Sequence, residues 1–229
     1  MDSDSIAIVF TPSGPRVGNL ENKQVVEFFQ QHMVPLYFTF QKDGTRQSFL
    51  YTAFVIDIND HWFLVTAGHV LRQIDNYVQA GFEIEKSRFI DTLPSQSTSN
   101  MANPFEYEPE DVFYADTDKG MDFGVIAVRD FYRRAMEKNR VVPLNESTWS
   151  EPAGKADRYL MLGIPEELSK VSEHKIDFAN MIHVVDPLEE RPKWFEKYNT
   201  PMFYGRIHLN SAVKSVSGMS GGPILALRS

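Results

Sequence analysis

Short β-rich runs separated by turn residues are the feature that most restricts the fold of this chain. Residues 36–41 form the first run, and the turn Lys42-Asp43-Gly44 joins it to a second run over residues 48–58. Asn59-Asp60 then predicts a tight hairpin turn into residues 62–66. Strands joined in this way form an antiparallel meander, and such sheets close into barrels or stack as sandwiches.

The rest of the chain is also mainly β in pattern. Apolar stretches predict further strands over residues 121–128, 158–163, 175–185 and 202–213. Two other segments suit short helices, over residues 21–33 and 130–139. Residues 81–120 look less regular and contain an exposed loop at 93–100. The polar stretch 140–154 predicts a linker between two halves.

Composition excludes several classes of protein. The chain has 229 residues, a formal net charge of −8 and no cluster of Lys and Arg, so we expect no nucleic-acid partner. Cysteine is absent, which excludes disulfides and thiolate zinc sites. The histidines at positions 32, 61, 174, 183 and 208 show no metal-ligand spacing. No apolar run approaches the roughly 20 residues of a membrane helix, and the acidic N-terminus lacks a signal-peptide core. We therefore expect a cytoplasmic protein with no membrane partner, no metal and no cofactor.

Three polar residues lie where apolar runs begin or end. His69 follows one such run, Asp122 opens another, and Ser220 lies in the turn Gly218-Met219-Ser220-Gly221-Gly222-Pro223. Taken singly, such residues are more often a core histidine, a turn or cap carboxylate and a glycine-rich turn. Together they supply the hydroxyl, imidazole and carboxylate of acyl transfer. The turn also directs two backbone N–H groups, those of Gly218 and Ser220, at one oxygen.

The order of the three residues separates one serine chemistry from another. The five residues 218–222 also fit the G-x-S-x-G elbow of α/β-hydrolases, which places its acid and histidine after the serine. None of the nine residues after Ser220 is Asp, Glu or His, so that class is excluded. A subtilisin-type order with Asp57 as the acid can be drawn, but the β-rich pattern and the Ser-Gly-Gly-Pro setting oppose it.

Three blocks of the sequence resemble the signature blocks of the trypsin-like (chymotrypsin-fold) serine peptidases, namely residues 66–69 (Thr-Ala-Gly-His), 122–126 (Asp-Phe-Gly-Val-Ile) and 218–223. The resemblance implies two antiparallel β-barrels with the active site between them. The first barrel then supplies His69 and Asp122, and the second supplies Ser220 and the oxyanion hole of Gly218 and Ser220. The corresponding division is a lead-in with a short helix (1–35), a first barrel (36–139), a linker (140–154) and a second barrel (155–229).

The sequence departs from that family at two points. Met219 stands where digestive members carry an aspartate, so the chain looks more like the cysteine-free bacterial and intracellular branches. Family members also continue past the Ser-Gly-Gly-Pro block with further strands, whereas this chain stops at residue 229. The second barrel is therefore expected to be incomplete. Three explanations stay open: a truncated product, a partner chain that completes the barrel, or a degenerate relative.

Two functions follow from this sequence. The first is a serine endopeptidase that hydrolyses a protein or peptide substrate through His69, Asp122, Ser220 and an acyl-enzyme intermediate. The alternative is a catalytically impaired module that acts in binding or regulation, because the strands that would complete the substrate pocket are absent. Lys214, six residues before Ser220, lies near the region where relatives line their specificity pocket, and it predicts a preference for an acidic side chain.

Overall fold

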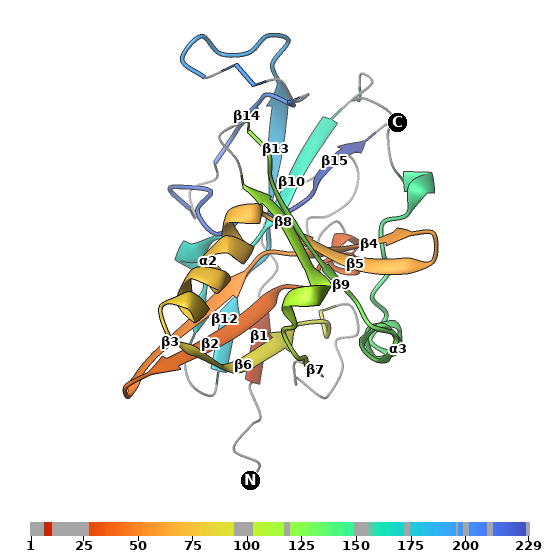
Figure 1. Cartoon of the computed structure of the whole chain (residues 1–229). Coiled ribbons are helices and arrows are strands. Elements are labelled where there is room, and N and C mark those ends of the chain that lie inside the picture. The colour runs from red at the N-terminus through yellow and green to blue at the C-terminus, as the bar shows by residue number, and fades with distance from the viewer. Residues whose placement is uncertain are drawn as a thin grey trace.

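A computed structural model of the chain describes the residues 7–10, 28–93, 103–116, 120–148, 156, 158–171, 175–195, 197–198, 202–209 and 213–227. The described chain is mainly β, which confirms the expected class, and Figure 1 shows its strands and helices. The strands form four sheets, and none of these closes into a barrel within the described residues. The two barrels expected from the sequence are therefore not present as closed barrels in the described part of the chain.

The first half of the chain contains two four-stranded antiparallel sheets (Figure 1). One has the order β3-β2-β6-β7, formed by β2 (Leu36–Lys42), β3 (Thr45–Tyr51), β6 (Glu83–Phe89) and β7 (Asn103–Pro104). The other has the order β4-β5-β9-β8, formed by β4 (Phe54–Ile58), β5 (His61–Thr66), β8 (Val112–Asp116) and β9 (Asp122–Ala127). Helix α2 (Gly68–Gln79) connects β5 to β6, and α3 (Asp130–Lys138) follows β9.

The core of the first half lies between these sheets and α2. Alternate residues of β2, Leu36, Phe38 and Phe40, are fully buried in it, because successive side chains of a strand point to opposite faces. Leu71 from the buried face of α2 joins the same cluster. A fully buried Phe or Leu side chain contributes about 1.5–3 kcal/mol, so this cluster holds the sheets and the helix together.

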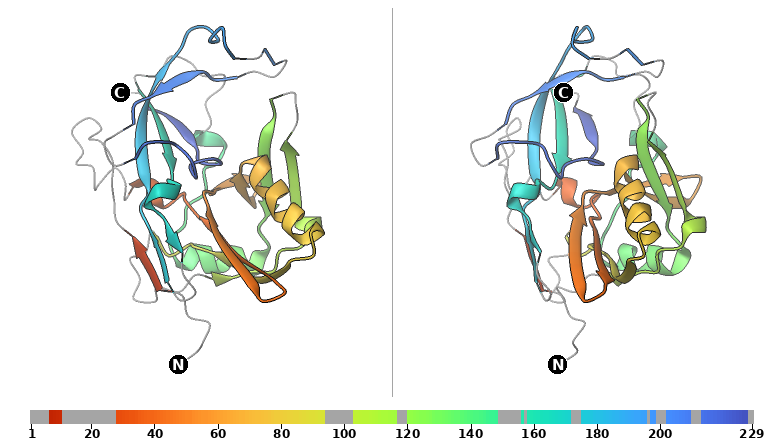
Figure 2. Two further views of the ribbon diagram at one scale, coloured as in Figure 1. Left: turned by 90° about the vertical axis from the view of Figure 1, so that its left-hand side faces the viewer. Right: turned by 60° about the vertical axis from the view of Figure 1, so that its left-hand side comes forward.

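The strands of the second half form a four-stranded sheet and, together with β1 from the N-terminal segment, a three-stranded sheet. The blue and teal strands of these sheets lie beside the first half in Figure 2. The larger sheet has the order β14-β13-β10-β15, formed by β10 (Arg158–Gly163), β13 (Met181–Pro187), β14 (Gly205–Ile207) and β15 (Ile224–Leu227). The smaller has the order β1-β12-β11, formed by β1 (Ala7–Phe10), β11 (Lys170–Val171) and β12 (Lys175–Phe178). Tyr37 of β2 packs in one cluster with Leu160 of β10 and Ile182 of β13, which joins the halves.

Two of the strands expected from the sequence are each divided in the structure. The expected strand 48–58 becomes β3 and β4, which separate at Thr52-Ala53 and belong to different sheets. The expected meander is therefore two hairpins. The expected strand 175–185 becomes β12 and β13, again in different sheets. In each case the sequence pattern gave no indication of the point at which the chain passes from one sheet to another.

Other expectations from the sequence have mixed outcomes. The hairpin turn Asn59-Asp60 is confirmed, with φ of 51° and 65°, and so are β9, α3 and β10. Helix α2 was not expected, and residues 81–120 are more regular than expected because they contain β6, β7, β8 and the 3₁₀ turn η1 (Pro109–Asp111). Of the expected strand 202–213, the structure describes 202–209 and 213, and within these only 205–207 form a strand.

Several predicted segments fall partly outside the described residues. The predicted helix 21–33 is described from residue 28, and residues 28–30 are helical. Of the predicted exposed loop 93–100, only Leu93 is described, and it is buried. The predicted linker 140–154 is described over residues 140–148, and this described part includes the 3₁₀ turn η2 (Glu146–Thr148). Its Leu144 exchanges two backbone hydrogen bonds of 2.9 Å with β4, at Val55 and Asp57. None of the described helices is long and apolar enough to cross a membrane.

Candidate functional site

His69 and Asp122 form a two-point contact between helix α2 and strand β9. The Nδ1–H group of His69 donates to Oδ2 of Asp122 over 2.8 Å, because an ionised carboxylate can only accept. The backbone N–H of His69 donates to Oδ1 of the same carboxylate, also over 2.8 Å. Both side chains are partly open to solvent, at 41% and 46% exposure. The ring orientation is therefore fixed while its Nε2 edge stays accessible.

Local sequence explains why helix α2 can begin beside Asp122. A Cβ at Gly68 would overlap the carbonyl oxygen of Ala115 on β8 and lie 2.9 Å from that of Phe123 on β9, so only glycine fits at the helix start. The N-cap residue Ala67 makes no side-chain capping bond, and the first turn carries no acidic residue. Asp122 supplies the missing acceptor from a different strand. It acts as the helix cap as well as the partner of the imidazole.

Ser220 lies in a loop made of two consecutive turns. The N–H of Met219 donates to the carbonyl of Val216 over 3.0 Å, and the N–H of Gly222 donates to that of Met219 over 3.1 Å. Gly218 and Gly221 have φ of +85° and +86°, in the left-handed region that favours glycine. Both glycines are also crowded, so the loop needs them for space as well as for conformation.

Contacts from both halves of the chain anchor this loop. Thr52, between β3 and β4, donates its hydroxyl to the carbonyl of Gly218 over 2.7 Å and accepts from the N–H of Ile164 over 3.0 Å. Thr66 donates to the carbonyl of Thr52 over 2.8 Å, which connects the strand preceding His69 to the same network. Met219 is fully buried among apolar side chains, including Met181.

The backbone of this loop leaves two amides free at the predicted oxyanion hole. The carbonyl of Ser217 accepts from the N–H of Glu166 over 2.8 Å and is thereby held away from Ser220. Met219 uses its own N–H within the turn, whereas no partner for the N–H groups of Gly218 and Ser220 occurs among the described residues. Free amides on either side of a paired one can bind a single oxygen.

One pocket of about 540 Å³ is lined by His69, Gly218 and Ser220 together. Residues of β3 and α2 line it as well, and so does Glu166, the first residue of the 3₁₀ turn η3 (Glu166–Leu168). The structure thus brings the predicted base, nucleophile and oxyanion donors to one cavity. Across the described part of the chain, no hydrogen bond joins the His69 imidazole to the Ser220 hydroxyl.

Two residues of this site were missed by the sequence reasoning. Thr52 and Glu166 have no motif around them, and their partners in the serine loop are distant in sequence. Lys214, predicted to favour an acidic substrate, does not line the pocket, and its backbone N–H donates to the carboxylate of Glu167. No group of side chains suited to a metal ion occurs among the described residues.

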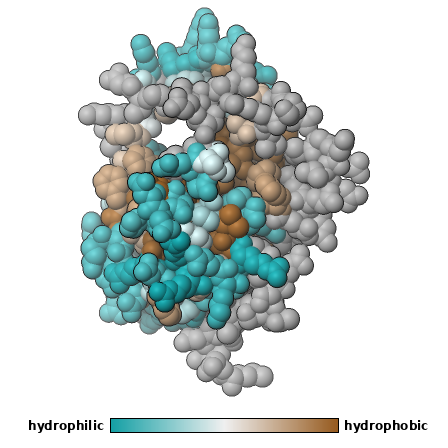
Figure 3. Space-filling model, turned by 90° about the vertical axis from the view of Figure 1, so that its right-hand side faces the viewer, coloured by the Kyte–Doolittle hydropathy of each residue, from teal (hydrophilic) through white to brown (hydrophobic). Residues whose placement is uncertain are grey.

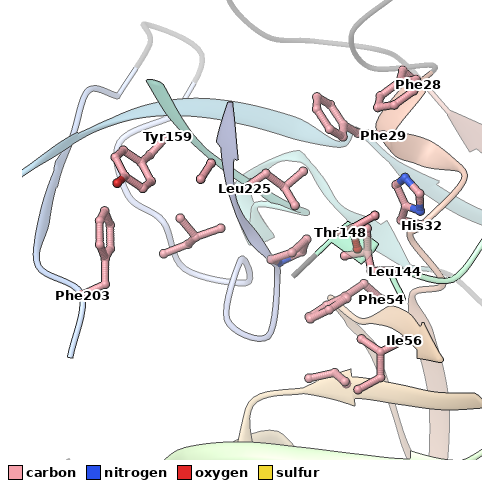
Figure 4. A pocket seen from close by; sticks show the side chains of 14 residues that line it. Phe28, Phe29, His32, Phe54, Ile56, Leu144, Thr148, Tyr159, Phe203 and Leu225 are labelled. Atoms are coloured by element: carbon pink, nitrogen blue, oxygen red, sulfur yellow. The ribbon is translucent and has the colours of Figure 1, made fainter. Parts of the chain in front are cut away.

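A second pocket, of about 630 Å³, lies between β15 and β4 and is mainly apolar. Figure 4 shows Leu225 on one side and Phe54 and Ile56 on another, with His32 nearby. Hydrophobic residues are also exposed on this side of the molecule (Figure 3). Desolvation lowers the pKa of His32, although its Nδ1–H donates to the carbonyl of Val142 over 2.7 Å. This larger pocket is lined by neither His69 nor Ser220, whereas the smaller one is lined by both, so the smaller pocket is the candidate site.

Comparison with known proteins does not assign the chain to a family. No protein-family model matches the sequence, and no curated protein matches it.

Proposed function

We propose that this protein is a serine endopeptidase of the trypsin-like type that cleaves a protein or peptide substrate. The observation that carries the proposal is the two-point contact of His69 with Asp122 on the pocket that Ser220 also lines. The free amides of Gly218 and Ser220 add the oxyanion donors that acyl transfer requires. The arrangement uses no metal and no cofactor.

Each residue has a defined role in this mechanism. Ser220 attacks the peptide carbonyl, and His69 removes its proton through Nε2, since Nδ1 keeps its proton toward Asp122. The Asp122 carboxylate stabilises the imidazolium that results. His69 then protonates the departing amine, and a water molecule activated by the same imidazole hydrolyses the acyl-enzyme. The oxyanion of both steps binds the amides of Gly218 and Ser220.

The proposal extends to the fold. On this proposal the two four-stranded sheets of the first half belong to the first barrel, and the sheets containing β10 and β12 belong to the second. Met219 supports an assignment to the branch that needs no charged residue before the serine, since its burial among apolar side chains anchors the loop. A partner chain whose strand pairs with the edge of the sheet containing β10 belongs to the same proposal.

A non-catalytic binding or regulatory module is the second candidate. The missing hydrogen bond between His69 and Ser220 in the described chain favours it, because a nucleophile and its base must come within hydrogen-bond reach. In serine peptidases this contact often tightens only when substrate binds. The two candidates therefore differ in whether the serine reacts at all.

Labelling with a fluorophosphonate probe distinguishes an enzyme from a module. We expect covalent labelling of the native protein, no labelling of Ser220→Ala, and labelling slowed about 10⁴-fold in His69→Gln. His61→Gln changes an exposed histidine at the start of β5 and is the matched control, so it keeps the native rate. The enzyme would be contradicted, and the module supported, if the folded native protein never labels. The same conclusion would follow if His69→Gln labels at the native rate.

A further inference from the structure

We propose that the pocket beside Ser220 binds the half of the substrate that departs as an amine, and that Glu166 selects a basic side chain in that half. This inference rests on the proposed function. It concerns the direction in which the pocket extends from the reacting atoms and the charges that line it.

The pocket extends toward the leaving-group side of the site. The carbonyl oxygen of the substrate must lie at the amides of Gly218 and Ser220, and the nitrogen that departs must face His69, which protonates it. From His69 the pocket continues past Val70 and Gln73, the latter one turn further along α2, and onto β3. Substrate residues after the cleaved bond therefore lie in this pocket.

Among the described residues that line the pocket, Glu166 is the only acidic one, and none is a lysine or an arginine. Its position is fixed twice by Ser217: the Glu166 N–H donates to the Ser217 carbonyl, and Oε2 accepts from the Ser217 hydroxyl over 2.8 Å. The other carboxylate oxygen, Oε1, makes no hydrogen bond within the described residues. A carboxylate that is positioned by a hydrogen bond to one oxygen and has its other oxygen unbonded can bind an ammonium or guanidinium group.

The remaining walls suit the aliphatic part of a basic side chain. Phe49, Leu50 and Val171 contribute apolar surface, and Gln73 and Ser169 contribute neutral polar groups. Lysine and arginine lay their methylene stems along apolar surface while the charged end reaches a polar group. The net charge of −8 on the whole chain attracts basic peptides in the same direction. This preference is opposite to the one that Lys214 suggested from the sequence.

Fluorogenic peptides that differ only after the cleaved bond test this inference. We expect kcat/KM for a peptide with lysine there to exceed that for its norleucine counterpart about fivefold at low salt, and the ratio to fall as salt is added. Glu166→Gln keeps an acceptor for the Ser217 hydroxyl but removes the charge, so the ratio should fall to about one. Glu167→Gln is the matched control and should keep the native ratio, since Glu167 does not line the pocket.

Two further measurements separate this inference from the proposed function. Fluorophosphonate labelling reports on the serine chemistry alone, so labelled protein without a lysine preference would overturn the inference and leave the proposed function standing. Binding of the fluorescent lysine and norleucine peptides to Ser220→Ala, followed by anisotropy, measures the preference without turnover. The inference would also be overturned if Glu166→Gln slowed both peptides equally, because the residue would then only position Ser217.

Discussion

Gly218 carries two demands that no other residue type meets. Its φ is +85°, and a Cβ there would lie 2.6 Å from the Glu166 nitrogen and 2.7 Å from the Ile164 carbonyl oxygen. Relief of that overlap must move the backbone, because both neighbouring atoms are main-chain atoms. The same backbone presents one of the two free amides at the site. Conformation, space and chemistry therefore coincide at this residue.

We expect Gly218→Ala to lower the free energy of unfolding by about 1–3 kcal/mol, and to slow fluorophosphonate labelling by more than about tenfold. Urea denaturation and labelling rates measure the two effects. Gly44→Ala is the matched control, since Gly44 has φ of +76° but nothing within 4 Å of an added Cβ. Equal losses in the two variants would show that crowding around Gly218 contributes nothing.

His32 gives the fold a defined pH dependence. Burial lowers its pKa below the usual 6.5, and the hydrogen bond to the Val142 carbonyl offsets only part of this. The unfolded chain therefore binds more protons than the folded chain below about pH 6.5, so stability falls as the pH decreases. Burial also lowers the pKa of His183, which acts in the same direction.

We expect the free energy of unfolding to decrease from pH 7 to pH 5, and His32→Asn to reduce this decrease without abolishing it, because His183 remains. Urea denaturation at several pH values measures the slope. His61→Asn, at an exposed histidine, should keep the native slope. A native slope in His32→Asn would contradict the assignment.

Among single residues, the sequence was sufficient to predict the proposed catalytic residues but not the residues that hold them in place. His69, Asp122 and Ser220 stand out because polar residues interrupt apolar runs. Thr52 and Glu166 carry no such signal. The hydroxyl of Thr52 bonds to partners 112 and 166 residues away, and local patterns contain no record of contacts at that range.

Among the elements, α2 depends on a cap that its own segment does not supply. The Asp122 carboxylate bonds to the His69 N–H from a position 53 residues further along the chain. It also places negative charge at the positive end of the helix. The sequence around His69 lacks the usual start signal of a helix, which is why α2 was not predicted although Val70, Leu71 and Ile74 form a buried face.

We expect Asp122→Ala to lower the free energy of unfolding by about 1 kcal/mol, and Asp122→Asn by less, since an amide oxygen still accepts the His69 N–H. Both variants should label with fluorophosphonate about 10⁴-fold more slowly. Asp57→Asn is the control, because it removes a carboxylate from β4 that makes no hydrogen bond with His69 among the described residues. It also tests the subtilisin-type order. An Asp122→Ala variant as stable as the native protein would show that the cap contributes nothing.

At the scale of the whole molecule, strand β15 lies at the edge of its sheet among the described strands. It pairs with β10 alone among the described strands, and Ile224 on it is 48% exposed. Unpaired N–H and C=O groups beside exposed apolar side chains favour pairing with another chain. The division of the strands among sheets could not be predicted, because apolar runs such as 48–58 give no indication of where a strand leaves its sheet.

We expect the native protein to associate weakly as its concentration rises, and Ile224→Lys to reduce this association, since a lysine on an edge strand opposes pairing. Light scattering across a concentration series measures the effect. Val78→Lys changes an equally exposed apolar residue on helix α2 and should associate like the native protein. Equal reduction by both variants would indicate a general effect of charge instead of an open strand edge.

The hydrogen bond from the His69 backbone N–H to Asp122 allows assembly of the site to be followed through that one amide proton. That proton is sheltered from solvent exchange only while α2 and β9 are docked on each other. The exchange rate and the NMR frequency of this one proton therefore report, without any substrate, what fraction of the molecules have His69 and Asp122 in contact. In an inactive preparation, this measurement then distinguishes molecules in which the site is not assembled from molecules in which it is assembled but does not react.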